Sequence, residues 1–511
     1  MVDQVQPAEV ENYNSCKQHS KLVQKQIKCE ITNGNYVITD EKPVIISALG
    51  AIPKSKTKVR LIHDASRPID KCVNSYVTSD CSCSYMDLRE AAKHITPGCY
   101  LAKIDLSSAY RSVKIHPSNY KATGLKYIFD GDTSPTFMYD TKLPFGASKS
   151  PQIFQTLTSA VCRMLKCKYG FLAIAYLDDF LVFGKTYDEC FKAMVKLVQL
   201  LRILGFAINW SKLEGPTQEI VFLGVLINTV SMTFSLSRDK LVSFYEILMN
   251  FSSRKRASRK QLEVLIGKLN WASQVINGGR TFLRRIINMK DNLCDNSHKM
   301  ILSEEFFADL HWWIAFMSVF NGTCAILDNK TITSIQTDAS SEGGGGYYNG
   351  DYFYVNWQLD LPPLAQEHIN VKEFLAIYFA FCRWGPTLCN KHVIVYSDNK
   401  SAVSWINKGT SRNTLVMYIL RLMFWMCAIN NVSLKAKYLP GVCNNIADAC
   451  SRLHEPDKLC LLYSWIPSLS LCDFSVYELS QHMSLHFISH RWLHSSRLRG
   501  SSDTLQRKGV G

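Results

Sequence analysis

Two apolar runs meet at a pair of adjacent acids within residues 171–183, and no other feature constrains the fold more tightly. Residues 171–177 are apolar or aromatic, Asp178 and Asp179 follow, and residues 180–183 are apolar again. Two short apolar runs joined by a polar turn are typical of a β-hairpin in a sheet. The sequence therefore predicts a hairpin that carries two carboxylates at its tip.

A third acid, Asp105, ends the strand-like run 99–105. Carboxylates beside a buried sheet are costly to desolvate, and a bound Mg²⁺, which takes one or two carboxylates plus substrate phosphates, offsets that cost. Two such ions about 4 Å apart stabilise the attacking and leaving oxygens in phosphoryl transfer. The alternative for an isolated Asp-Asp pair is a turn with two solvated side chains. The apolar runs on both sides of Asp178 and Asp179 favour the metal site.

Composition excludes several classes of protein. Of the 511 residues 47% are hydrophobic, which rules out a disordered or collagenous chain. At about 150 residues per domain the length predicts roughly three to four domains. The net charge of +15 favours a polyanionic partner, either nucleic acid or an anionic membrane surface. The longest apolar runs are interrupted by charges, at Asp178-Asp179 and at Arg421, so nucleic acid is favoured and no membrane association is expected.

The 18 cysteines are scattered and include no CxxC pair, so a zinc ribbon or finger has no support. The N-terminus is polar where a signal peptide needs an apolar region. Reduced thiols are the better interpretation, and we expect an intracellular protein of the cytoplasm, the nucleus or both.

Six blocks, taken in chain order, resemble those of reverse transcriptases. They lie at 49–54, 60–67 (Arg-Leu-Ile-His-Asp-Ala-Ser-Arg), 103–110 (Lys-Ile-Asp-Leu-Ser-Ser-Ala-Tyr), 143–155 (with Leu-Pro-Phe-Gly-Ala-Ser), 176–179 (Tyr-Leu-Asp-Asp) and 212–224 (Lys212, then Phe-Leu-Gly). The resemblance implies that Asp105, Asp178 and Asp179 are the catalytic ligands of two Mg²⁺, for which Mn²⁺ can substitute.

The same resemblance assigns a nucleotide-binding set. Its members are Lys58, Arg60, Tyr110, Phe145, Gly146 and Lys212. Lys58 and Arg60 would meet the incoming triphosphate, since both residue types suit phosphate. The family places a bulky aromatic at the position of Tyr110, under the sugar, to exclude a 2′-hydroxyl, and Phe145-Gly146 would border the pocket. The alternatives are ordinary core packing for Tyr110 and Phe145 and a solvated strand-edge charge for Arg60.

Helical periodicity and positive charge coincide in residues 237–290. A capping-box signature at Ser258 and Gln261 precedes apolar residues at helical spacing. Between 250 and 290 there are ten Lys or Arg against one acid, Glu263. The segment resembles the thumb of retrotransposon reverse transcriptases, and a basic helix face suits duplex phosphates. The alternative is a solvated helix face.

A second α/β pattern begins near residue 332. Strands are expected at 332–338, 345–349, 351–356 and 392–397, and helices at 371–383, 399–407 and 412–429. Four acids in this region have the order and spacing of ribonuclease H: Asp338, Glu373, Asp398 and Asp448. The resemblance implies catalysis by these four with two more Mg²⁺, which would activate a water to cut the RNA strand of a hybrid. Many relatives carry a His ten residues before the last acid. Tyr438 stands there in this chain, so slower cleavage is expected.

We therefore predict an α+β multidomain chain: a right-hand polymerase (fingers, palm and helical thumb) followed by an α/β ribonuclease H-like domain. The expected boundaries are 1–40 for an N-terminal extension, 41–230 for fingers and palm, 231–292 for the thumb, 293–330 for a connection, 331–453 for ribonuclease H and 454–511 for a partly disordered tail. In that tail His482, His486, His490 and His494 recur every four residues. A metal-binding stripe is one interpretation, and a chance pattern is the preferred one.

The predicted function is that of a retrotransposon enzyme, DIRS-like or, next, Gypsy-type. It would be an RNA-directed DNA polymerase (a nucleotidyltransferase) with a linked ribonuclease H (an endonuclease and hydrolase). Its partners would be an RNA template, a DNA primer, an RNA–DNA hybrid and dNTPs. The main alternative is a domesticated or decayed retroelement protein that binds nucleic acid without turnover. A DNA-templated or telomerase-like polymerase is a weaker alternative, because a linked ribonuclease H argues against it.

Overall fold

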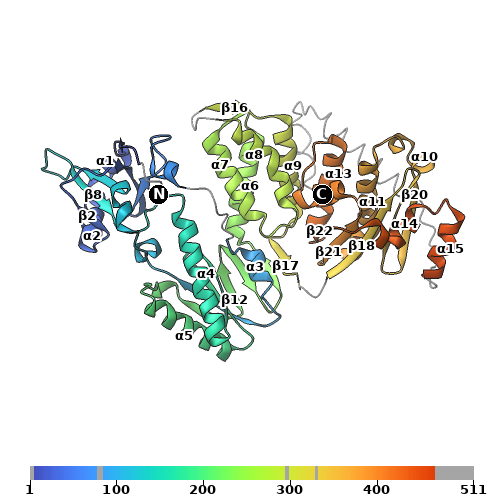
Figure 1. Cartoon of the computed structure of the whole chain (residues 1–511), viewed down its shortest axis with the longest axis horizontal. Coiled ribbons are helices and arrows are strands. Elements are labelled where there is room, and N and C mark those ends of the chain that lie inside the picture. Colours follow the sequence, from blue (N-terminus) through green and yellow to red (C-terminus); the bar gives the residue numbers. More distant parts are fainter. Residues whose placement is uncertain (1–4, 78–84, 294–297, 328–331, 466–511) are drawn as a thin grey trace, which may run out of the picture. The chain divides into compact units, whose positions relative to one another are not determined.

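The structure is a computed structural model that describes residues 5–77, 85–293, 298–327 and 332–465. The chain divides into two compact units, residues 1–236 and 237–511 (Figure 1), and each is considered by itself. Within the described ranges, no helix is long and apolar enough to cross a membrane. The histidine stripe at 482–494 lies outside the described residues.

The palm is a four-stranded antiparallel sheet in the order β11-β6-β10-β9. Its strands are β6 (Tyr100–Asp105), β9 (Leu172–Tyr176), β10 (Asp179–Gly184) and β11 (Glu214–Thr217), and helices α4 (Ser150–Tyr169) and α5 (Tyr187–Ile203) pack on it. Phe154 and Leu165 of α4 and Leu197 of α5 are buried in one core with strand residues such as Ile104 and Phe180. The predicted hairpin is confirmed, with its turn at Leu177 and Asp178.

The fingers contain a five-stranded sheet in the order β1-β3-β7-β8-β2 and a separate hairpin, β4–β5. The strands are β1 (Ala8–Glu9), β2 (Tyr36–Ile38), β3 (Ile45–Ile46), β4 (Ala48–Ser55), β5 (Lys58–Asp64), β7 (Gly124–Tyr127) and β8 (Thr136–Asp140). The short 3₁₀ helix η2 (Ala109–Ser112) follows the palm strand β6.

Residues 1–40 carry no reliable periodicity, yet the structure folds most of this segment against the fingers. It forms α1 (Asn14–Gln18), α2 (Ser20–Thr32) and β2. Val23 and Ile27 of α2 are fully buried in a core with Leu61 of β5. Only these two residues of α2 are buried, so its apolar face is too narrow to give a clear helical pattern.

Further short elements complete the first unit. They are α3 (Leu88–Ala92), the 3₁₀ helix η4 (Trp210–Lys212), and the strands β12 (Glu219–Phe222), β13 (Val225–Asn228) and β14 (Thr233–Ser235), which form an antiparallel meander.

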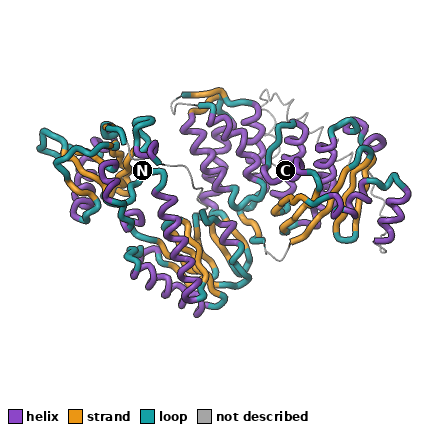
Figure 2. The backbone as a smooth tube through the Cα atoms, viewed as in Figure 1, coloured by secondary structure: helices purple, strands orange, loops and turns teal. Residues whose placement is uncertain are grey.

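The second unit opens with a helical bundle, drawn in purple in Figure 2. Its helices are α6 (Arg238–Ser252), α7 (Arg259–Ala272), α8 (Arg284–Asp291) and α9 (Glu304–Val319), joined by the 3₁₀ helix η5 (Gly279–Leu283) and the strand pair β15 (Arg256–Ser258) and β16 (Lys299–Ile301). The capping box is confirmed, since the Ser258 amide donates to Gln261 Oε1 and the Gln261 amide to Ser258 Oγ. Helix α9 falls in the expected connection, and it packs against α6 and α8.

A five-stranded sheet in the order β20-β19-β18-β21-β22 forms the remainder. Strands β18, β19 and β20 are antiparallel neighbours, whereas β18, β21 and β22 run parallel. The elements are β17 (Thr323–Ala325), β18 (Ile332–Ala339), β19 (Gly343–Tyr348), β20 (Asp351–Asn356), α10 (Trp357–Asp360), α11 (Ile369–Trp384), β21 (His392–Ser397), α12 (Lys400–Lys408), α13 (Thr414–Ile429), β22 (Ser433–Tyr438), α14 (Asn445–Ser451) and α15 (Pro456–Trp465). All seven elements expected here are present, and β17, α10, β22, α14 and α15 are additional.

The glycine run in β19 has a packing reason. A Cβ on Gly345 would lie 2.4 Å from the backbone carbon of Cys450, and one on Gly344 would lie 2.4 Å from the ring of Trp357. Helix α14 therefore approaches the sheet more closely than side chains would permit. This close approach brings the last expected acid, Asp448, to the same sheet as Asp338.

The helical bundle and the five-stranded sheet share one hydrophobic core. Leu265 and Trp313 from the bundle belong to the same buried cluster as Leu420 and Phe424 of α13. An ion pair joins the same two parts, because Arg421 Nη2 of α13 donates to Asp309 Oδ1 of α9 at 2.9 Å. Asp309 is fully buried. Helix α9 is therefore an internal layer of this unit.

We expect Arg421→Met to destabilise the second unit by about 3–5 kcal/mol, because it leaves the buried Asp309 carboxylate without its main partner. Chemical unfolding followed by tryptophan fluorescence measures this, since Trp312 and Trp313 lie on α9. The double variant Asp309→Leu/Arg421→Met removes both charges and should recover most of the loss. A single variant as stable as the wild type would contradict a structural role for the pair.

Candidate active sites

The first acidic site is built by strand register. Asp105 at the end of β6 is the direct cross-strand partner of Asp179 at the start of β10. Asp178 occupies the turn between β9 and β10, where its carbonyl oxygen accepts a hydrogen bond from the Leu106 amide at 3.0 Å. The three acids expected at this site are therefore adjacent in the sheet.

Gln155 of α4 holds the hairpin turn in place. Its side chain is buried, its Nε2 donates to the Ala175 carbonyl at 2.8 Å, and its Oε1 accepts from the Leu177 amide at 2.8 Å. Leu177 has a φ of +53°, a backbone conformation that is uncommon for a branched residue. Such strain persists only where surrounding contacts impose it, and Gln155 supplies two of those contacts.

Electrostatics distinguish the three acids. Asp105 accepts hydrogen bonds from Asn209 Nδ2 at 2.8 Å and from Lys212 Nζ at 2.9 Å. Burial raises the pKa of Asp178, and burial together with the charges of Asp178 and Asp105 raises the pKa of Asp179 to about 6. Carboxylates that disfavour each other's charge are the donor set that a divalent cation stabilises. These residues fit Mg²⁺. In the sequence, Gln155 is visible only as the last residue of the fourth resemblance block, and Asn209 lies outside all six blocks.

Four of the expected nucleotide-binding residues lie together. The ring of Tyr110 is 4.8 Å from that of Phe145 between centroids, and the Arg60 guanidinium is 5.4 Å from the Phe145 centroid. Gly146 has a φ of +125°, and a Cβ there would lie 1.8 Å from the carbonyl oxygen of His63. Only glycine fits this backbone position.

The other two expected nucleotide-binding residues, Lys58 and Lys212, lie outside this aromatic group. Lys58 is an exposed residue at the start of β5, and Lys212 forms an ion pair with Asp105. The structure adds Lys54 of β4, whose pKa is lowered by burial and by the nearby positive charges of Arg60, Lys212 and Lys58. These four cations form a positive region beside Asp178. In the sequence, Lys54 is visible only as part of the first resemblance block.

The second acidic site lies in the five-stranded sheet unit. Asp338 on β18, Glu373 on α11 and Asp398 after β21 offer carboxylate oxygens that all lie within 4.8 Å of one another. Ser451 Oγ donates to Asp338 Oδ2 at 2.6 Å. Burial and the charges of Asp338 and Asp398 raise the pKa of Glu373 to about 9, and burial raises the pKa of Asp338 to about 6. Three crowded, mostly buried carboxylates fit a divalent cation.

The fourth expected acid, Asp448, lies outside this three-acid cluster. Its carboxylate forms ion pairs with Arg452 Nε at 3.0 Å and with Lys458 Nζ of α15 at 2.7 Å. Tyr438, at the position where the resemblance implies a His, is exposed and has Lys400 Nζ 5.2 Å from its ring centroid. The structure therefore brings three of the four acids together.

Five of the ten basic residues expected on the thumb are exposed. They are Lys255, Arg256, Lys260, Arg280 and Arg284. Others make internal contacts: Arg259 donates to the Leu293 carbonyl, and Arg285 lies 3.9 Å from Asp309. The positive charge of this segment is thus partly structural and partly available to a polyanion.

Comparison with known proteins gives a family for part of the chain. Residues 52–227 match the family model described as reverse transcriptase (RNA-dependent DNA polymerase), so the chain contains a reverse transcriptase domain. A putative enzymatic polyprotein of Cassava vein mosaic virus is 25% identical over 382 residues, which are 70% of this chain and 53% of the relative. The Transposon Tf2-3 polyprotein of Schizosaccharomyces pombe is 21% identical over 440 residues, 82% of this chain and 30% of the relative. The chain spans about half or less of these relatives, and it is related to polyproteins of retroelements.

Solved structures show the same fold. The foamy viral protease-reverse transcriptase dRH in complex with double-stranded DNA has a TM-score of 0.53 and 16% identity, over 86% of this chain and 72% of that chain. The foamy viral protease-reverse transcriptase in complex with an RNA/DNA hybrid has a TM-score of 0.51 and 16% identity, over 86% and 55%. The predicted fold class, a multidomain α+β chain with a polymerase fold followed by a further domain, is confirmed.

Proposed function

We propose that the chain is an RNA-directed DNA polymerase of a retroelement with a linked ribonuclease H. The observation that carries the proposal is the strand register that sets Asp105 opposite Asp179, inside a domain that matches the reverse transcriptase family model. Asp105, Asp178 and Asp179 would hold two Mg²⁺, which neutralise the phosphate charge and activate the primer hydroxyl. Lys212 would leave Asp105 when the ions bind.

The residues around this site support a nucleotide-binding role. Arg60 and Lys54 carry positive charge toward a triphosphate, and Tyr110 with Phe145 forms an aromatic wall. The exposed basic residues of the thumb suit the phosphate backbone of a primer–template duplex, which Lys and Arg side chains bind electrostatically and without sequence preference. The proposed partners are an RNA template, a DNA primer and dNTPs.

The three-acid cluster of Asp338, Glu373 and Asp398 supports the second activity. With Mg²⁺ bound there, these residues would orient a water toward the RNA strand of an RNA–DNA hybrid. A retrotransposon of DIRS-like type, or next of Gypsy type, would use the two activities in succession on one template, within the cytoplasm or the nucleus.

Two assays on the full chain test this proposal. Primer extension on poly(rA)/oligo(dT) with Mg²⁺ or Mn²⁺ should incorporate dTTP, and a labelled RNA–DNA hybrid should be cut only in its RNA strand. Chelation by EDTA should stop both reactions. A purified, folded chain that extends no primer in either ion would exclude the polymerase.

The thumb charges give a separate prediction. Lys255→Gln/Lys260→Gln should lower the slope of log K against log salt for duplex binding by about 2, because each phosphate contact adds about one unit. Fluorescence anisotropy with a labelled duplex at several salt concentrations measures the slope. The matched control is the double variant Lys185→Gln/Lys192→Gln. Lys185 lies just before α5 and Lys192 lies on it, and both are exposed. This variant should leave the slope unchanged. Equal slopes of log K against log salt for the two double variants would show that the duplex does not contact Lys255 and Lys260.

One observation favours a second candidate function. Asp448 forms ion pairs with Arg452 and Lys458 and is not part of the three-acid cluster, an arrangement compatible with hybrid binding without cleavage. Salt-sensitive hybrid binding with no product in either assay would favour that function. Turnover in either assay would reject it.

A further inference from the structure

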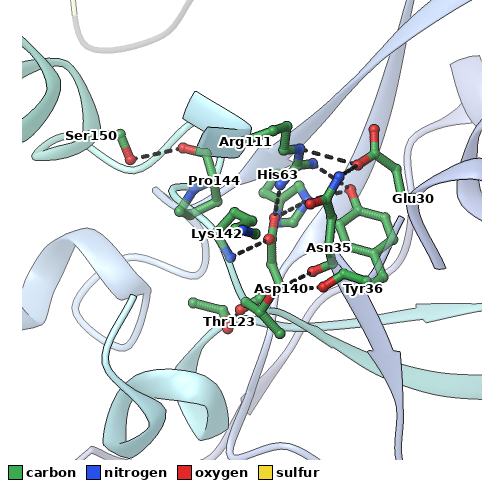
Figure 3. Close-up of polar contacts among 12 residues, drawn as sticks. Glu30, Asn35, Tyr36, His63, Arg111, Thr123, Asp140, Lys142, Pro144 and Ser150 are labelled. Carbon is green, nitrogen blue, oxygen red and sulfur yellow. Dashed lines mark hydrogen bonds and ion pairs between the residues drawn. The ribbon is translucent and has the colours of Figure 1, made fainter. Parts of the chain in front are cut away.

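A buried polar cluster lies beside the nucleotide-binding residues, and no step proposed above uses it. Five elements each contribute one side chain (Figure 3): Glu30 from α2, Tyr36 from β2, His63 from β5, Arg111 from η2 and Asp140 from β8. We name this set the fingers cluster. Two of its members come from residues 1–40, to which the sequence pattern assigned no role.

Arg111 is the centre of the fingers cluster. Its Nη1 donates to Asp140 Oδ2 at 2.6 Å, its Nε lies 3.2 Å from Glu30 Oε2, and its Nη2 donates to the Tyr36 hydroxyl at 3.3 Å. The Tyr36 hydroxyl in turn lies 2.8 Å from His63 Nε2. One guanidinium thus connects all the other members directly or through one hydroxyl.

Burial makes these contacts mutually dependent. Asp140 is fully buried, and the side chains of His63 and Arg111 are 3% and 10% exposed. Burial, with the charge of Arg111, lowers the pKa of His63 to about 3, and burial raises the pKa of Asp140 to about 6. Inside a protein such a network stabilises a unique arrangement only when every member is satisfied.

Two members adjoin the two residues of the aromatic wall, one through the covalent chain and one through a backbone hydrogen bond. Arg111 directly follows Tyr110 in η2. The His63 amide donates to the Phe145 carbonyl at 2.8 Å, and the His63 carbonyl is the atom against which Gly146 packs. The fingers cluster therefore spans from the chain that carries Tyr110 to the chain that carries Phe145 and Gly146.

Asp140 fixes the segment that precedes Phe145. Its Oδ1 accepts from the Lys142 amide at 2.9 Å, and its carbonyl accepts from Thr123 Oγ1 at 2.7 Å. Four residues further on, the Pro144 carbonyl accepts from Ser150 Oγ at 2.9 Å, at the start of α4. The loop that leads to Phe145 is thus held at both ends, as Figure 3 shows.

We propose that the fingers cluster is a positioning device for the nucleotide pocket, which fixes the placement of the paired rings of Tyr110 and Phe145 and thereby sets discrimination against a 2′-hydroxyl. The inference rests on the proposed polymerase function. Arg111 and Asp140 are positioning residues, since they act through Tyr110, Phe145 and Gly146. Small displacements of groups that orient a substrate have large effects on its reaction.

The test compares single-nucleotide incorporation by wild type and Arg111→Met. We expect the KM for dTTP to rise about tenfold and the preference for dTTP over UTP to fall about tenfold, the effect of misplacing a substrate-orienting wall. The kcat for dTTP and the KM for primer–template should change by less than about threefold, because the acids and the thumb are untouched. Arg111→Lys retains the positive charge but lacks the planar set of N–H donors of a guanidinium. It should therefore be more selective than Arg111→Met and less selective than wild type.

Lys126→Met is the matched control. Lys126 lies on β7 of the same fingers sheet, is 11% exposed, and forms ion pairs with Glu9 and Glu11. Lys126 takes part in none of the hydrogen bonds and ion pairs described for the fingers cluster. We expect a comparable loss of thermal stability for Lys126→Met and Arg111→Met, and a change of sugar selectivity for Arg111→Met alone.

Each outcome decides the proposal. If Arg111→Met does not fold, Tyr36→Phe, which removes only the hydroxyl between Arg111 and His63, must shift selectivity in the same direction. Unchanged selectivity in the folded Arg111 variant or in Tyr36→Phe, with an active wild type, overturns the positioning role and leaves the polymerase proposal intact. An equal loss of selectivity in Lys126→Met also overturns it. A wild type that extends no primer overturns both.

Discussion

Primer extension should fall by at least about a thousandfold in Asp179→Asn, because a metal ligand supplies several kcal/mol of transition-state charge stabilisation and each 1.36 kcal/mol is a factor of ten. Steady-state incorporation of dTTP on poly(rA)/oligo(dT) measures the loss. Asp188→Asn, which changes an exposed acid on α5 in the same way, should remain within about twofold of wild type, as is usual for exposed substitutions. Extension by Asp179→Asn at half the wild-type rate would contradict the proposed site.

Asp179 should also affect stability with a defined pH dependence. Its pKa is raised in the folded chain, to about 6 from the ordinary value of 3.8 for an Asp side chain. The folded state therefore holds the proton more tightly than the unfolded state, and the charged form is a cost to folding above pH 6. In EDTA, Asp179→Asn should melt above wild type at pH 8, and the difference should shrink as the pH falls from 6 toward 4. A lower melting temperature for the variant at pH 8 would contradict this.

Hybrid cleavage should be lost in Glu373→Gln while primer extension persists. Glu373 is one of the three clustered acids, so the rate of hybrid cleavage should fall by at least about a thousandfold, as for loss of a metal ligand in the first site. Cleavage of a labelled hybrid and dTTP incorporation are measured on one preparation. Glu367→Gln, a partly exposed residue before α11, is the control and should retain both activities. Retained cleavage in Glu373→Gln would exclude the cluster as the catalytic centre.

The pKa of Glu373 gives a readout that does not depend on cleavage. Because it is raised to about 9, Glu373 carries a proton at pH 7.5, and a cation must displace that proton to bind the carboxylate. Mg²⁺ affinity should therefore rise as the pH increases toward 9. Binding should release close to one proton, measured by calorimetry in buffers of different ionisation enthalpy. Glu373→Gln should bind Mg²⁺ without this release, and a release equal to that of wild type would assign the proton to another group.

Local patterns were sufficient where neighbours in sequence decide the structure. The hairpin at 171–183 and the strand that ends at Asp105 are both visible as apolar runs that end in acids, and the structure sets Asp105 opposite Asp179. Their meeting was expected from the resemblance, because no local pattern gives the order of strands in a sheet. The same holds for Asp338, Glu373 and Asp398, which three different elements bring together.

Contacts between distant segments account for what was not predicted. Gln155 and Asn209 resemble any polar residue in the sequence, and only the tertiary fold directs them to the hairpin turn and to Asp105. Asp448 was expected to join the other acids, but it forms an ion pair with Lys458 of α15. Helix α15 lies in a segment whose weak periodicity gives no sign of a helix. Arg111 follows an expected pocket residue, yet its buried partners lie up to about eighty residues before it in the chain.

The single core that unites the helical bundle with the five-stranded sheet limits how this chain can be shortened or recombined. A cut near residue 330, between the expected connection and ribonuclease H, would expose Trp313 and Phe424 together and leave Asp309 without Arg421. A cut at 236/237 follows the division between the two compact units. Exchange of the proposed ribonuclease H domain between such chains would therefore require the helical bundle to be transferred with it, so the two parts are expected to be inherited and engineered as one module.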